Sequence, residues 1–191
     1  MKKSAWLSFL FLAIIAGSLI FIVASRSWPL YIEPGDGAGD SNVAVRPAGE
    51  QLMGSTFIVP GVGTAVDLRP EPVDYGSGNN SGSVVFLPQY AVETSVADAE
   101  YIMAPVAANT GGSGMFVYLV LYEKQDEHFR QAGEVLLGDR IKIADVAAVS
   151  GGQVRVTIYE RAAAEPFSAE PTVPKTLSFT IENGRLVSNQ N

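Results

Sequence analysis

The spacing of apolar residues along most of the chain is that of β-strands. Residues 153–159 and 175–181 alternate strictly, with Val154, Val156 and Ile158 sharing one face of the first segment. Successive side chains of an extended strand point to opposite faces, so this alternation predicts strands with one buried face. The eight uninterrupted apolar residues 115–122 instead predict a central strand that is buried on both faces. No stretch after Ala24 keeps a helical spacing of apolar residues for three turns.

Turn-forming residues separate these segments and complete the fold prediction. Asn183-Gly184 is the strongest short hairpin signal in the chain, and Pro105 predicts a sheet edge or a bulge. A bulge near Ala144-Asp145 would keep the apolar residues of 141–149 on one face. About nine short strands with turns between them predict a mainly β fold, an antiparallel β-sandwich or a partly closed barrel. The predicted strands cover residues 56–59, 64–68, 83–87, 101–106, 115–122, 128–137, 141–149, 153–159 and 175–181, with a short last one at 185–187.

The N-terminal segment has a different pattern, which predicts one transmembrane helix. After Lys2 and Lys3, residues 5–24 form an apolar run without a charged residue. About twenty helical residues span roughly 30 Å, the thickness of the hydrocarbon core of a bilayer. We therefore expect residues 5–25 to anchor the chain in the cell membrane; the alternative is a long signal peptide cleaved after Ser25. The lysines before the span place residues 1–4 in the cytoplasm and the rest of the chain outside the membrane.

Proline and glycine mark a linker between this anchor and the β-rich part. Residues 26–54 hold three prolines and five glycines, including the stretch Gly-Asp-Gly-Ala-Gly-Asp-Ser at 35–41. A segment of this composition cannot bury enough apolar surface to fold by itself. We expect residues 26–54 to be a flexible tether, followed by an extracytoplasmic β-rich domain at residues 55–188.

Composition argues against several classes of function. The chain of 191 residues has no cysteine and one histidine, and its 20 acidic residues outnumber 13 basic ones, for a formal charge of -7. Without cysteine there are no disulfides, thiolate metal sites or cysteine nucleophiles, and one histidine cannot build a multi-histidine metal site. Binding to nucleic acid needs clustered lysine and arginine, against which this acidic balance argues. We therefore expect no cofactor, no metal site and no nucleic-acid partner.

Three motifs, taken in order, resemble an uncharacterised family of small exported, membrane-anchored bacterial proteins. The matching segments are Gly-Gly-Ser-Gly-Met-Phe-Val-Tyr at 111–118, Leu-Leu-Gly-Asp-Arg-Ile at 136–141 and Glu-Asn-Gly-Arg-Leu-Val at 182–187. Residues 55–59 are similar to the family's opening strand, so the resemblance extends over residues 55–187. Relatives often carry an Asp-x-Asn-x-Asp-Gly loop suited to Ca²⁺, whereas residues 93–100 keep acids but lack the glycine. The resemblance implies an exported β protein without this calcium loop, and it implies no particular activity.

The long loop between two strong strands is the main candidate for contact with a partner. Residues 161–174 exceed the usual hairpin loop of about two to five residues and carry Glu165, Phe167 and Glu170. Long loops on rigid β scaffolds are where binding often resides, so Phe167 either anchors a partner or folds back onto the sheet. Asp139-Arg140, which follows a strand, predicts a turn clamp or a structural ion pair.

The sequence contains no convincing catalytic arrangement. A triad of Ser113, His128 and Asp139 would lack the strand-to-helix turn that exposes a serine nucleophile. The acidic residues that a hydrolase could use are Glu93, Asp98, Glu100, Glu165 and Glu170. We therefore expect a non-catalytic, membrane-tethered β domain that binds an envelope protein or glycan. The alternatives are a hydrolase of the envelope that uses acidic side chains and a passive structural protein of the envelope.

Overall fold

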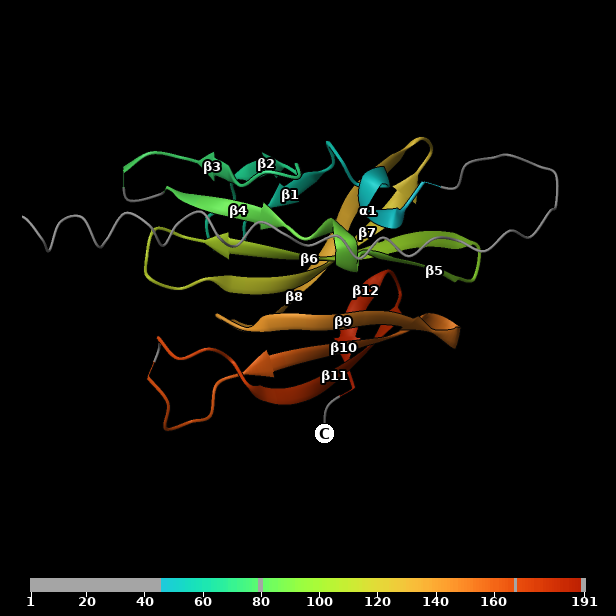
Figure 1. Cartoon of the computed structure of the whole chain (residues 1–191). Coiled ribbons are helices and arrows are strands. Elements are labelled where there is room, and N and C mark those ends of the chain that lie inside the picture. The colour runs from blue at the N-terminus through green and yellow to red at the C-terminus, as the bar shows by residue number, and fades with distance from the viewer. Residues whose placement is uncertain (1–45, 79–80, 167, 190–191) are drawn as a thin grey trace, which may run out of the picture. The chain divides into compact units, whose positions relative to one another are not determined.

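The computed structural model describes residues 46–78, 81–166 and 168–189, and in them the chain is mainly β (Figure 1). The paired strands are antiparallel, and none of these sheets closes into a barrel. The predicted anchor at residues 5–25, most of the predicted linker and Phe167 lie outside the described residues. None of the helices in the described part of the chain could span a bilayer.

The larger sheet has six strands in the order β3-β4-β6-β7-β8, with β5 also paired to β6. Its strands are β3 (Val73–Tyr75), β4 (Gly82–Phe86), β5 (Val92–Val96), β6 (Ala99–Asn109), β7 (Phe116–Gln125) and β8 (His128–Asp139). β7 lies between β6 and β8, and its consecutive residues Leu119, Val120 and Leu121 are all fully buried. The prediction of a central strand with two buried faces is confirmed.

Pro105 lies inside β6, between the segments that pair with two different neighbours. β5 pairs with β6 as far as Met103, and β4 pairs with it from Val106 onward. The carbonyl group of Pro105 accepts a hydrogen bond from the Leu87 N–H on this side, at 3.2 Å. The N–H that proline lacks would point to the same side, into the gap between β4 and β5. The prediction of an edge or a bulge at Pro105 is therefore wrong, because a change of pairing partner accommodates the proline.

The smaller sheet has four strands in the order β12-β11-β10-β9. They are β9 (Lys142–Val149), β10 (Gln153–Glu160), β11 (Val173–Glu182) and β12 (Arg185–Ser188), and the short helical turn η3 (Ser150–Gly152) joins β9 to β10. The register between β9 and β10 shifts at Ala144, which leaves Ile143 and Val146 both buried. The bulge predicted there is confirmed, as is the Asn183-Gly184 turn, whose φ angles of 50° and 73° are left-handed.

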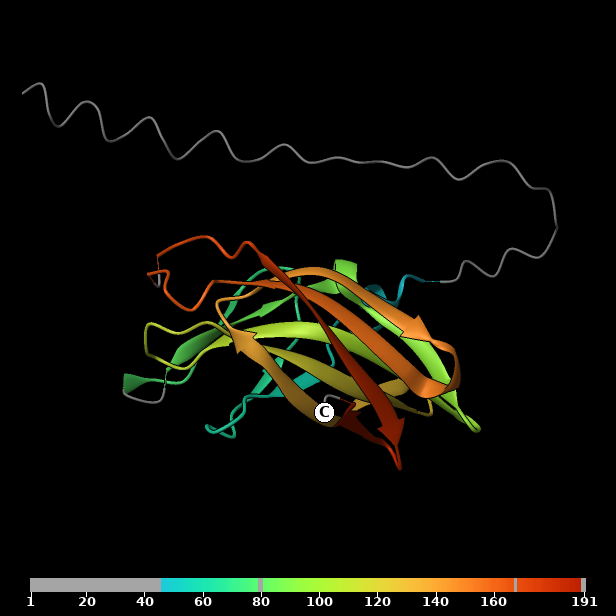
Figure 2. The ribbon, with the colours of Figure 1, turned by 90° about the horizontal axis from the view of Figure 1, so that it is seen from below.

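Two apolar cores hold the domain together. One lies between the two sheets and joins Leu119 and Leu121 of β7 to Val156 and Phe179 of the smaller sheet. In Figure 2 the smaller sheet is nearest to the viewer, and its strands cross over the larger sheet. The other core lies on the opposite face of the larger sheet, under the helix α1 (Ala48–Gln51) and the hairpin of β1 (Thr56–Ile58) and β2 (Ala65–Asp67). The larger sheet is therefore covered on both faces.

The packed domain begins earlier in the chain than residue 55. Leu52 is fully buried, and Gly49 lies against Pro88 of the helical turn η2 (Pro88–Tyr90). A Cβ atom at Gly49 would come within 2.3 Å of the carbonyl oxygen of Pro88. Residues 48–53, which their composition assigns to the flexible linker, thus pack with the β domain. The glycine that suggested flexibility is needed here for close contact between backbones.

Candidate functional site

A groove of about 920 Å³ lies at one end of the two packed sheets, and we call it the end groove. Its base is the end of the larger sheet, where β6, β7 and β8 contribute Tyr101, Glu123 and Arg130. The β5–β6 turn, with Asp98, and the β11–β12 turn, with Asn183, line its sides. Both turns lie at the same end of the domain in Figures 1 and 2.

The register of the larger sheet places three polar side chains at the base of the groove in one row. Tyr101 pairs with Glu123 across β6 and β7, and Glu123 pairs with Arg130 across β7 and β8. The next pair on the same face, Met103 and Leu121, belongs to the core between the sheets. Residues two apart in a strand share a face, so this row continues the core face of the sheet toward solvent. The core thus ends in polar side chains at this end of the domain.

Tyr101 lies beside Glu123 at the base of the groove. The tyrosine is only 6% exposed, and it is the register partner of Glu123, whose carboxylate interacts with the tyrosine hydroxyl group. Burial raises the pKa of Tyr101, and the neighbouring Glu123 carboxylate raises it further. A Cβ atom at Gly184 would lie 3.8 Å from the tyrosine hydroxyl oxygen, so the β11–β12 turn packs over Tyr101. The hydroxyl therefore stays protonated at neutral pH, next to a carboxylate that also faces the groove.

Two arginines reach the end groove from different sheets. Arg130 belongs to β8 and Arg185 begins β12, and both are exposed. Neither makes an ion pair or a side-chain hydrogen bond with any residue in the described part of the chain. Lys142 and Lys175, in contrast, each contact a glutamate. The guanidinium groups of the groove are therefore available to a ligand.

The groove combines hydrogen-bond donors and acceptors of several kinds. Arg130 and Arg185 supply charged donors, Asp98 and Glu123 supply carboxylate oxygens, and Gln125 adds an amide group. Among the described residues there is no group of three histidine or acidic side chains that could hold a metal ion. Such a lining suits a polar ligand that presents both donors and acceptors.

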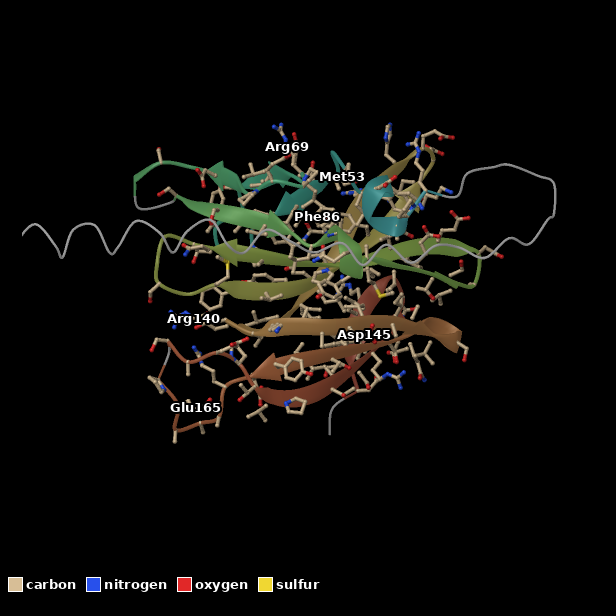
Figure 3. All side chains as sticks on the ribbon, viewed as in Figure 1. Met53, Arg69, Phe86, Arg140, Asp145 and Glu165 are labelled. Atoms are coloured by element: carbon tan, nitrogen blue, oxygen red, sulfur yellow. The ribbon has the colours of Figure 1, made fainter. Side chains whose placement is uncertain are left out.

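The loop predicted to contact a partner lies at the opposite end of the domain (Figure 3). Glu165 accepts a hydrogen bond from the backbone N–H of Ala162 at 3.0 Å, within the loop. Glu170 lies 3.8 Å from the Lys142 ammonium group at the start of β9, and both side chains are well exposed. Phe167 lies outside the described residues. The two acids of this loop thus contact the protein itself and are remote from the end groove.

Asp139 and Arg140 contact the turn at residues 111–114. The Arg140 guanidinium donates to the Ser113 carbonyl oxygen from Nε at 3.0 Å and to its hydroxyl oxygen from Nη2 at 3.1 Å. Asp139 accepts from the backbone N–H of Met115 at 2.9 Å, and the Arg140 N–H donates to the Met115 carbonyl group at 2.8 Å. The two side chains lie 3.8 Å apart, and Figure 3 labels Arg140 at the same end as the loop. Both side chains bind the protein's own turn.

The structure does not gather the residues of the two catalytic hypotheses. His128 and Asp139 are the first and last residues of β8, so a triad with Ser113 cannot form. His128 instead lines a second, mostly polar hollow of about 460 Å³ between α1 and the β7–β8 turn. Of the candidate acids, Glu93 contacts Gln51 and Glu100 contacts Lys124. Asp98 is the one candidate acid that lines the end groove.

Apart from Asp98, sequence reasoning missed the polar residues that form the end groove. Tyr101, Glu123 and Arg130 come from three strands, and only the sheet register brings them into one row. A signal was present: Glu123 is two residues after Leu121 and Tyr101 two residues before Met103, so both continue an apolar alternation. A polar residue at a core position near a strand end indicates either a strand that extends beyond the sheet packed on it or a binding site.

Comparisons of the chain with protein-family models, with curated proteins and with solved structures found no match.

Proposed function

We propose that this protein is a single-pass membrane protein whose β domain stands outside the cell membrane and binds a component of the cell envelope in the end groove, without catalysis. Residues 5–25 act as the anchor, with residues 1–4 in the cytoplasm. The proline- and glycine-rich segment that follows holds the domain near the membrane surface.

The end groove is the observation that carries the binding part of this proposal. It is a hollow of about 920 Å³ that presents carboxylates, amide groups and two guanidinium groups that make no ion pair within the described part of the chain. Ligand sites are concave, commonly a few hundred to about 1,000 Å³, with a small number of well-placed polar groups. A passive structural protein needs no such hollow, and of the five acids considered for hydrolysis only Asp98 lines it.

Sequence features support the location. An uncharged apolar run long enough to span a bilayer follows two lysines, and the chain after it is acidic. The absence of cysteine suits an exported protein that folds without oxidation. The resemblance to exported, membrane-anchored bacterial proteins agrees with this orientation.

Thermal unfolding of the full chain in detergent micelles tests the proposal. The panel contains peptidoglycan fragments, neutral oligosaccharides and short peptides. A ligand at about 100 times its dissociation constant adds about 2.7 kcal/mol to the unfolding free energy. For a domain of this size, that corresponds to a rise of roughly 5–10 °C in the unfolding temperature.

Two tryptophan variants make the test specific to the groove. Gln125 is exposed and lines the groove, so Gln125→Trp fills part of it; Thr176 is exposed on the outer face of the smaller sheet, so Thr176→Trp adds the same bulk elsewhere. We expect the ligand to stabilise the wild type and Thr176→Trp, and not Gln125→Trp. An unfolding temperature that no ligand raises, or that rises equally in both variants, would contradict the proposal.

A further inference from the structure

We infer that the ligand of the end groove is an acidic peptide segment, whose carboxylate binds Arg130 and Arg185 while its N–H groups donate to Glu123. The inference rests on the proposed function, since it names the ligand class of the same groove. It comes from the chemistry of the groups that the described residues leave unsatisfied there.

The two arginines indicate a carboxylate on the ligand. They are held on separate sheets, one in β8 and one at the start of β12, yet both face one hollow. In a chain with a formal charge of -7, neither has a carboxylate of the described residues within ion-pairing distance. Glu123 is the register partner of Arg130, and even this pair forms no salt bridge. A guanidinium group matches a carboxylate with two parallel N–H···O bonds, so a carboxylate would satisfy both arginines.

The acids of the groove indicate a ligand that also carries hydrogen-bond donors. The Glu123 carboxylate lies beside the Tyr101 hydroxyl group and makes no salt bridge with the described residues, so it can accept hydrogen bonds from a ligand. Asp98, in the β5–β6 turn, is exposed and has no partner among the described residues. Acceptors beside arginines suit the N–H groups of a peptide backbone. They would repel a phosphate group, which carries more negative charge than a carboxylate.

A neutral sugar fits this lining less well. Tyr101 is the aromatic residue of the groove, and at 6% exposure it offers no open ring face on which a sugar could pack. A neutral ligand would also leave both guanidinium groups without a counter-charge. A peptide with Asp or Glu side chains, or with a free C-terminal carboxylate, meets both requirements.

Selection from a library of random hexapeptides tests the inference. The full chain in micelles is immobilised, and peptides retained by the wild type are sequenced and then measured one by one by fluorescence anisotropy. We expect retained peptides to be enriched in Asp and Glu. Replacing both groove arginines (Arg130→Gln with Arg185→Gln) should weaken their binding about tenfold or more, because charge-assisted bonds are lost.

A matched pair of substitutions controls for net charge. Arg69 and Arg155 are exposed and lie outside the groove lining, so Arg69→Gln with Arg155→Gln removes the same charge elsewhere. This control should bind within about twofold of the wild type, because remote surface charges are screened. Unfolding temperatures of both double variants verify that the domain is folded.

The outcomes separate this inference from the proposed function. Retained peptides without an excess of acidic residues, no retained peptide, or equal affinity in the two double variants would overturn the acidic-peptide inference. If a neutral oligosaccharide then stabilises the wild type and not Gln125→Trp, the groove still binds a ligand and only its class is wrong. If nothing in either experiment binds the groove, the proposed function fails as well.

Discussion

Replacing Tyr122 by phenylalanine should stabilise the domain, although most substitutions in a core destabilise. Tyr122 is fully buried in the core beneath α1 and the β1–β2 hairpin. In the described part of the chain, its hydroxyl group is the buried side-chain polar atom that has no hydrogen-bond partner. Burial raises the pKa of Tyr122, and the Glu134 carboxylate nearby adds to this effect. The hydroxyl is thus a neutral group that has lost its water and gained no bond.

The size of the effect follows from two opposing contributions. A buried polar group without a partner costs about 1–3 kcal/mol of unfolding free energy, which Tyr122→Phe recovers. Removing one oxygen atom leaves a cavity of about 10 Å³, which costs only about 0.2 kcal/mol. We therefore expect the unfolding free energy to rise by about 1–3 kcal/mol, which corresponds to roughly 3–9 °C in the unfolding temperature.

Tyr75→Phe provides the matched control. The Tyr75 hydroxyl donates to the Asn109 carbonyl oxygen at 3.0 Å, so this substitution removes a bond that is made and should cost about 0.5–1.5 kcal/mol. Urea unfolding followed by circular dichroism is the assay, because Trp6 and Trp28 lie outside the described β domain. If Tyr122→Phe destabilises the domain as much as Tyr75→Phe does, the hydroxyl has a partner, such as a bound water, and the reasoning is refuted.

Three further predictions concern the rest of the domain. Leu52→Ala should lower the unfolding free energy, measured by urea unfolding, by about 2–5 kcal/mol, because Leu52 is a buried core residue. A loss below about 0.5 kcal/mol would show that Leu52 belongs to the flexible linker instead. Since Tyr101 and Tyr122 have pKa values raised above their usual 10.0, the unfolded state loses these protons first. Stability should thus be independent of these groups below about pH 10 and fall above it, and a urea midpoint that stays constant from about pH 9 to about pH 11 would contradict this. Arg140→Ala should cost about 1 kcal/mol by releasing the turn at Ser113, and it should leave ligand binding in the end groove unchanged in the anisotropy assay.

The local sequence pattern predicts strands well where the alternation of apolar and polar residues alone determines which face is buried. The buried strand β7, the bulge at Ala144 and the Asn183-Gly184 turn depend on residues close together in sequence. The prediction at Pro105 is wrong because the proline is tolerated where β6 changes its pairing partner from β5 to β4, which the residues next to it in the sequence do not show. The assignment of Gly49 to the flexible linker is wrong for the same reason. Composition does not show that Gly49 contacts Pro88, which is distant in the sequence.

The candidate site was harder to predict, because it is a property of packing. Glu123 and Arg130 face solvent only if their strand ends extend beyond the smaller sheet. The local sequence pattern alone does not decide this. The loop with Glu165 and Glu170 attracted attention through its length, yet those acids contact the protein's own loop backbone and Lys142. Long loops are visible in a sequence, whereas a groove between sheets is not.

The most direct test of the central claim is cysteine labelling, which is clean because the chain has no cysteine of its own. Gln125→Cys reports on the end groove, and Asp145→Cys reports on an exposed position of β9, labelled in Figure 3. A membrane-impermeant maleimide is added to intact cells that have no outer membrane. In a separate experiment it is added to the purified chain. We predict that both cysteines react in intact cells, before lysis. We also predict that the rate of Gln125→Cys divided by that of Asp145→Cys is lower in cells than after purification, because a ligand occupies the groove in cells. Reaction only after lysis, or the same ratio of rates in both settings, would contradict an extracytoplasmic binding domain.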